Sequence, residues 1–183
     1  MNVFILDKDP IIAAQLQCDK HVVKMIVESA QMLSTAHRML DGNLETRLTR
    51  TGRKSRYYAL PDEREDVLYK AVHFGHPCTV WTMESRANYV WHYIHFLGLC
   101  DEYTYRYGKK HATDALLKDW LVNIPENIPD GKLTPFRLAM GSNPECITEN
   151  PVESYRNYYK TKKGRFKMTW TNRKTPEWFN ANV

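Results

Sequence analysis

The chain has 183 residues, 43% of them hydrophobic and 12% aromatic, so it can bury a substantial core and is not an intrinsically disordered protein. The formal net charge is +5, and no apolar stretch is long enough for us to expect a membrane-spanning helix. The N-terminal sequence lacks the features of a signal peptide, and the four cysteines form no Cys-x-x-Cys pair, which predicts a cytoplasmic protein with reduced thiols.

Proline positions and apolar spacing predict helices near the start of the chain. The pair Asp9-Pro10 is typical of a helix start, because proline tolerates the first helical position, and it predicts a short helix over 10–17. Asp19 is the expected N-cap of a long helix over 19–40. The sequence NVFIL at 2–6 is the one strand candidate.

The remainder of the chain is also predicted to be helical, over 62–74, 77–107 and 112–122. The longest of these helices repeats apolar residues at steps of three and four, so we expect it at the centre of the core. Residues 123–150 hold four prolines and two glycines, which predicts an ordered loop region. The predicted fold class is mainly α: a single compact helical domain, residues 1–183, with a long central helix and a basic, aromatic C-terminal segment.

Positive charge gathers in this C-terminal segment, residues 150–183, which holds eight Lys or Arg, two Glu and seven aromatic rings. Such a composition is typical of proteins that bind nucleic acids, because cations neutralise phosphates and rings stack on bases. The residues expected to contact DNA there are Arg156, Lys160, Lys162, Lys163, Arg165 and Trp170. A second basic cluster lies at 44–58, and for both clusters the alternative interpretation is a solvated surface.

Glu28 belongs to a polar face of the predicted helix over 19–40. His21 and Lys24 precede it at steps of three and four, so the three side chains share one side of that helix. The simplest interpretation is a solvent-exposed face with a Lys24–Glu28 ion pair worth about 0.2–0.5 kcal/mol. The alternative interpretation is a reactive site in which an amine and a carboxylate lie one turn apart.

Several short motifs together resemble a known enzyme family. The sequence DKH at 19–21, followed by Glu28, is similar to the first helix of the bacteriophage pyrimidine-dimer DNA glycosylase/AP-lyase family. A His-Pro pair that opens a helix, then Glu102 and RYG at 106–108, resembles a second helix of that family. The sequence YRNYYKTKKG is similar to its aromatic and basic tail, which lies against DNA. These patches cover about half of the chain in the family's order.

The resemblance implies a role for each residue of the polar face. Glu28 would be the catalytic carboxylate, which stabilises positive charge on the sugar and then transfers protons. The family's nucleophile is an N-terminal α-amine, and because Asn2 disfavours removal of methionine, we expect the amine of Met1 in that role. Lys24 is the second candidate nucleophile, and His21 is expected to bind a phosphate or to orient Glu28.

Two further groups of residues have side chains suited to binding a ligand. Arg38 and Arg86 are expected to clamp phosphates of the DNA backbone. His92 and His95, three positions apart, have the spacing of a metal-binding pair, but the chain contains no Cys-x-x-Cys and no His-Glu-x-x-His motif. We therefore expect no metal site and no cofactor.

Together these features predict a DNA glycosylase, with or without AP-lyase activity, that acts on damaged or modified pyrimidines. Its chemistry would use an amine that forms a Schiff base and a catalytic glutamate. DNA is the expected partner. Two alternatives stay open: a non-catalytic nucleic-acid-binding module, and an enzyme of modified-nucleotide metabolism built on the same scaffold.

Overall fold

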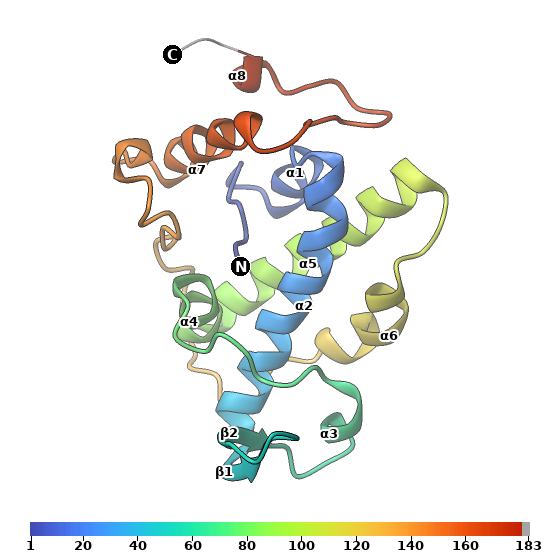
Figure 1. Cartoon of the computed structure of the whole chain (residues 1–183), viewed down its shortest axis with the longest axis vertical. Helices are drawn as coiled ribbons and strands as arrows, with labels where there is room; N and C mark the ends of the chain where they lie inside the picture. Colours follow the sequence, from blue (N-terminus) through green and yellow to red (C-terminus); the bar gives the residue numbers. More distant parts are fainter. Residues whose placement is uncertain (181–183) are drawn as a thin grey trace.

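The protein is mainly α-helical, and the computed structural model describes residues 1–180 (Figure 1). Helices α2 and α5 pack against each other at the centre, and α1, α4 and α6 pack around them. Helix α7 lies near the N-terminal end of α2, and the β1–β2 hairpin lies at its other end (Figure 1). The elements are α1 (Pro10–Gln15), α2 (Asp19–Asp41), β1 (Asn43–Leu48), β2 (Lys54–Ala59), α3 (Arg64–Val67), α4 (Pro77–Glu84), α5 (Arg86–Tyr107), α6 (Ala112–Leu121), η1 (Pro144–Cys146), α7 (Pro151–Lys160), η2 (Thr161–Gly164) and α8 (Glu177–Asn180).

The N-terminal segment 3–6 is buried in the core, but the strand predicted there is wrong. Within residues 1–180 no other strand pairs with this segment, so its backbone groups must find other partners. The amide of Asn2 donates to the carboxylate of Glu28 at 2.9 Å. Arg156 on α7 donates to the carbonyl oxygen of Leu6, also at 2.9 Å. Side chains thus replace a neighbouring strand.

Helix α2 begins one residue differently from the prediction, because Cys18 and not Asp19 is its N-cap. The carboxylate of Asp19 instead binds groups from distant parts of the chain. It accepts hydrogen bonds from Arg106 on α5 and from Thr169 and Thr171 in the C-terminal segment, all at 2.8–2.9 Å. Although burial alone would raise the pKa of Asp19, these hydrogen bonds lower it. Asp19 therefore anchors the C-terminal segment to α2.

The helix predicted over 77–107 is two helices, α4 and α5, which are separated at Ser85. Ser85 is extended, with φ −156° and ψ 158°, and its hydroxyl caps α5 by accepting the amide N–H of Asn88. The side chain of Asn88 then donates to the carbonyl oxygen of Trp81 at 2.7 Å, which satisfies the end of α4. The apolar spacing continues across the break, but Ser85 is an N-cap signal that the periodicity conceals.

The helix predicted over 62–74 is also wrong: only the single turn α3 forms, and the chain then wraps around the guanidinium of Arg38. Arg38 is 1% exposed, and all five of its N–H groups donate within the protein. Their acceptors, at 2.6–3.0 Å, are the backbone carbonyls of Tyr58, Glu65, Leu68 and Tyr69 and the carboxylate of Glu65. Since no donor is left for a ligand, Arg38 stabilises the fold, and the predicted phosphate clamp at this position is wrong.

The basic cluster at 44–58 forms the β1–β2 hairpin, which was not predicted. The strands pair antiparallel, with Asn43 opposite Ala59 and Leu48 opposite Lys54. Gly52 adopts φ +76° in the turn, a conformation that glycine accepts without strain. Strand β1 is exposed along its whole length, so its sequence lacks the alternation of apolar and polar residues by which strands are recognised.

Replacing Arg38 with methionine should lower the free energy of unfolding by about 3–5 kcal/mol, because the carboxylate of Glu65 and four carbonyl groups lose a buried cationic partner. Urea denaturation followed by circular dichroism measures the change. Arg86→Met is the control: Arg86 is 53% exposed beside Asp130, so its loss should cost less than about 1 kcal/mol. Equal losses in the two variants would contradict a structural role for Arg38.

Candidate functional site

A pocket with a volume of about 310 Å³ opens between the N-terminal segment, α2 and the end of α7. It brings together the residues predicted from the polar face of α2 and several that lie far away in the sequence. Its lining consists of Met1, Asn2, Phe4, His21, Lys24, Met25, Glu28, Tyr158, Lys162, Arg165 and Phe166. The volume is close to the lower end of the range for small-molecule sites, about 300–1,000 Å³.

Glu28 lies between two amines at the base of this arrangement. Its Oε2 atom accepts the amide N–H of Asn2 and is 3.8 Å from the α-amine of Met1. Its Oε1 atom is 3.1 Å from Nζ of Lys24. The side chain of Glu28 is 12% exposed, whereas that of Lys24 is 65% exposed. The carboxylate is therefore held in place by the backbone and is in reach of two candidate nucleophiles.

His21 is held away from Glu28 by a different set of partners. Its Nδ1 atom is 2.7 Å from the hydroxyl of Tyr159, and its ring stacks on Phe4 with centroids 4.6 Å apart. The same hydroxyl accepts the amide N–H of Cys18, so we assign its own proton to Nδ1 of His21 and the imidazole proton to Nε2. The expected orienting contact with Glu28 is thus replaced by one with Tyr159.

Burial is the main cause that lowers the pKa of His21 to about 4, and the nearby cations Lys24 and Lys162 contribute in the same direction. The imidazole is therefore neutral at physiological pH. A neutral ring with its proton on Nε2 offers a ligand one hydrogen-bond donor and no charge. In this state His21 can bind a phosphate, one of its two predicted roles, through a hydrogen bond from Nε2 but not through an opposite charge.

Lys162 is a buried cation at the side of the pocket. The residue is 5% exposed, and its Nζ lies 3.5 Å from the ring centroid of Tyr158. No carboxylate within residues 1–180 forms a salt bridge with Lys162 or with its neighbour Arg165. The pocket therefore holds the Met1 amine, Lys24, Lys162 and Arg165 against the single carboxylate of Glu28, a balance that favours an anionic ligand.

His76 lies near the site, although it was not among the residues predicted to form it. Burial lowers its pKa, and the Met1 amine acts in the same direction while Glu28 opposes it, so His76 is close enough to both groups to sense their charges. The His76-Pro77 pair predicted the start of α4, and His76 is indeed the N-cap of that helix. Its nearness to Met1 depends on the path of the N-terminal segment, which no local pattern reveals.

The remaining residues predicted to contact DNA do not line this pocket. Trp170 is 7% exposed and donates to the carbonyl oxygen of Leu16, so stacking on a base is not available to it and that prediction is wrong. Arg156 binds the Leu6 carbonyl and Asp7, and Lys163 donates to the carbonyl oxygen of Phe179. Lys160 lines a separate recess beside Trp178, and Arg86 pairs with Asp130.

Glu102 belongs to a structural cluster and not to the wall of the pocket. Its carboxylate accepts from Arg106 on the next turn of α5 and from Arg173 in the C-terminal segment, at 2.7–3.3 Å. Arg106 also binds Asp19 and the carbonyl oxygen of Gln15. The residues that resemble the family's second helix thus join α5, α2 and the C-terminal segment.

The histidines considered for a metal site have other partners. Nδ1 of His92 is 2.7 Å from the hydroxyl of Thr82, and the ring of His95 bonds to the backbone of Pro10 and Val3. Across residues 1–180, His, Cys, Asp and Glu side chains form no group of three or more that could hold a metal ion. None of the helices in that part of the chain is long and apolar enough to cross a membrane.

Comparisons with known proteins add no relative: no protein family, no curated protein and no solved structure matches this chain.

His21 should stay neutral at pH 7 with its proton on Nε2, because burial lowers its pKa and Tyr159 occupies Nδ1. Long-range ¹H–¹⁵N NMR, with the His21 signals assigned by their absence in His21→Gln, measures both properties. We expect a titration midpoint near pH 4. Tyr159→Phe should keep the titration midpoint low, but the imidazole proton should no longer be confined to Nε2. A midpoint near 6.5, or a proton on Nδ1 in the parent protein, would contradict a buried His21 that accepts a hydrogen bond from the Tyr159 hydroxyl.

Proposed function

We propose that the protein is a DNA glycosylase with AP-lyase activity that acts on a damaged or modified pyrimidine. One observation supports this function above the others: the buried carboxylate of Glu28 lies within 4 Å of two amines, in a pocket whose other charged side chains are cations. A Schiff-base mechanism on DNA needs an amine close to a carboxylate, with cations nearby that bind phosphate groups.

The Met1 amine is the favoured nucleophile. Only an uncharged amine attacks, and α-amines as a class lose their proton at lower pH than lysine amines, about 7.7–8.0 against about 10.4. The ammonium first loses its proton to water, and Glu28 stays ionised. The nitrogen then bonds to C1′ of the deoxyribose as the C1′–N bond to the base breaks, and the base leaves with the bonding electron pair and takes up a proton from water.

Glu28 would also serve the later steps. Its negative charge stabilises the positive charge on the sugar as the base leaves. Glu28 then accepts a proton from the new C1′-bound ammonium and passes it to the ring oxygen as the ring opens to an imine. Loss of a proton from C2′ then expels the 3′ phosphate by β-elimination, which cleaves the strand. Hydrolysis of the remaining imine restores the amine.

The cations of the pocket would hold the phosphates that flank the target nucleotide. A base stacked in duplex DNA must be turned out of the helix before its sugar reaches Glu28, at a cost of a few kcal/mol. Contacts from Lys162 and Arg165 would offset that cost, and the rings of Phe166 and Tyr158 offer apolar surface to the extruded base.

The second candidate function is an enzyme of modified-nucleotide metabolism. The volume of the pocket, about 310 Å³, suits a single nucleotide, and the same charges would bind its phosphate. The two candidates differ in substrate: the first needs a polymer, and the second a free mononucleotide. Trapping experiments with both substrates separate them.

Glu28→Gln should slow formation of a borohydride-trapped adduct on abasic-site DNA by about 10²–10⁴-fold, because the amide neither accepts a proton nor stabilises the cationic sugar. Its oxygen still accepts the Asn2 amide, so DNA affinity and fold should change little. Glu149→Gln, an exposed site outside the pocket, is the matched control. If Glu28→Gln traps DNA at the parent rate, Glu28 is not the catalytic carboxylate. An adduct or product with mononucleotide only would favour the second candidate.

The trapped adduct should map to Met1. Proteolysis and mass spectrometry of the reduced complex locate the modified amine, and Lys24→Ala should still form the adduct at a rate within about threefold of the parent protein, because Lys24 is mostly exposed and its loss leaves the Met1–Glu28 contact intact. A DNA adduct on Lys24 or Lys162 would assign the nucleophile to a lysine and contradict this part of the mechanism.

A further inference from the structure

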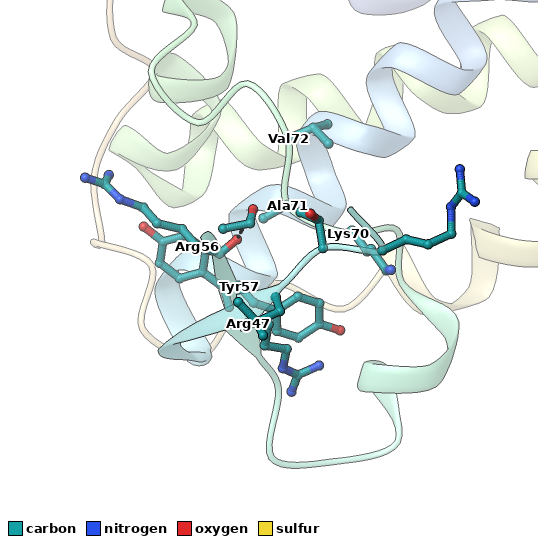
Figure 2. A pocket seen from close by; sticks show the side chains of 11 residues that line it. Arg47, Arg56, Tyr57, Lys70, Ala71 and Val72 are labelled. Carbon is teal, nitrogen blue, oxygen red and sulfur yellow. Dashed lines mark hydrogen bonds between the residues drawn. The ribbon is translucent and has the colours of Figure 1, made fainter. Parts of the chain in front are cut away.

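The β1–β2 hairpin forms one wall of a second recess, with a volume of about 470 Å³, whose other wall is the segment 70–72 (Figure 2). Figure 2 shows Arg47, Arg56 and Lys70 around this recess together with Tyr57. None of these residues belongs to the pocket around Glu28. The recess is therefore a separate surface feature that the proposed chemistry does not use.

Positive charge on the hairpin is largely unpaired. Residues 43–59 hold five Lys or Arg and one Glu. Glu45 pairs with Arg47, whose guanidinium also stacks on Tyr57 at 3.5 Å from the ring centroid. The other four cations are exposed, and within residues 1–180 no carboxylate forms a salt bridge with them; they are Arg50, Arg53, Lys54 and Arg56.

The hairpin is fixed to the body of the protein rather than loosely attached. Glu65 accepts hydrogen bonds from the hydroxyl of Tyr57 and from the Leu60 amide, and it pairs with Arg38. Burial would raise the pKa of Glu65, but these hydrogen bonds and the Arg38 charge lower it to about 2. In the turn, the Thr49 amide donates to the carbonyl oxygen of Arg53 at 2.8 Å. The cations are thus presented on a preorganised ribbon.

The recess and the Glu28 pocket lie along the same side of α2. Thr35 is seven residues beyond Glu28, or two turns, so both side chains point to one face. The Thr35 hydroxyl accepts the Val72 amide at 3.1 Å, which fixes the inner wall of the recess to that face. At 1.5 Å per residue, Thr35 lies about 10 Å from Glu28 along the helix, and the start of β1 lies about 22 Å away.

We propose that the hairpin binds the phosphate backbone of duplex DNA at a distance of about six base pairs from the nucleotide held at Glu28. A two-stranded ribbon fits the major groove, and unpaired arginines release counterions when they contact phosphates. The spacing follows from about 22 Å along α2 and about 3.4 Å per base pair. The position on the DNA rests on the proposed function, whereas the binding of the hairpin does not.

The test compares Arg50→Ala/Arg53→Ala with Lys109→Ala/Lys110→Ala, which removes the same charge from exposed residues just beyond the C-terminal end of α5. The probe is a duplex of about 30 base pairs with a central, unreactive abasic-site analogue. The hairpin variant should bind about tenfold more weakly at 0.1 M salt, and the slope of log K against log salt should shrink by about 2. The control variant should stay near the parent protein in both measurements.

Shortened duplexes provide the positional test. Two shortened duplexes each keep about three base pairs on one side of the analogue and full length on the other side. Only one of the two truncations should weaken binding of the parent protein. The hairpin variant should show no further loss on that same duplex. Unchanged thermal stability would confirm that the variant is folded.

Three results would overturn the proposal: equal losses in the two charge variants, parent affinity that is independent of duplex length, or a loss in the hairpin variant for RNA but not for duplex DNA. These outcomes are distinct from failure of the glycosylase proposal. The analogue cannot react, so its binding does not depend on Glu28 chemistry, and the hairpin variant should still form the borohydride adduct when protein is saturating.

Discussion

The contact between the Glu28 carboxylate and the backbone of Asn2 is the constraint on which the arrangement of the molecule depends. It fixes the beginning of a segment, residues 3–6, that lies in the core, where no strand of the described residues 1–180 pairs with it. A buried backbone with unsatisfied groups would cost several kcal/mol, so side chains from surrounding helices must supply donors and acceptors. Glu28 supplies one at the start, and Arg156 supplies another at Leu6. The same carboxylate thus positions the N-terminal amine and limits how far it can move from α2.

The basic C-terminal segment has two different roles in this structure. Arg173 and Arg156 bind acceptors on α5 and in the N-terminal segment, and Lys163 binds the carbonyl oxygen of Phe179 within the C-terminal segment itself. Lys162 and Arg165 line the pocket, and no carboxylate among the described residues forms a salt bridge with them. A count of charges therefore overstates the positive surface of this segment, and the cations open to a ligand are found in the Glu28 pocket and on the hairpin. The unpaired cations thus lie at the two places proposed to contact DNA, the Glu28 pocket and the β1–β2 hairpin.

Local signals in the sequence predicted those elements that depend on local contacts. Proline with a capping side chain marked the starts of α1 and α4, and helical spacing placed Lys24 and Glu28 on one face. The errors concern long-range contacts. The backbone of segment 62–74 is arranged around the guanidinium of Arg38, and segment 2–6 is hydrogen-bonded by side chains of helices. Neither conformation is therefore determined by residues that are close in the sequence. Burial of Lys162 over Tyr158 and the approach of His76 to Met1 have the same origin, and no spacing rule anticipates them.

Four enclosed imidazoles make the folded state sensitive to acid. Burial lowers the pKa of His21, His37 and His95 to about 4 and that of His92 to about 3. An unfolded chain would protonate each of them near pH 6.5, about two pH units or more before the native protein does. As pH falls from 6.5 towards 4, the unfolded state gains protons that the native state excludes, so stability declines over that interval. Below it, Asp19, Asp41 and Glu65, whose pKa values folding lowers, continue the decline as they too become protonated.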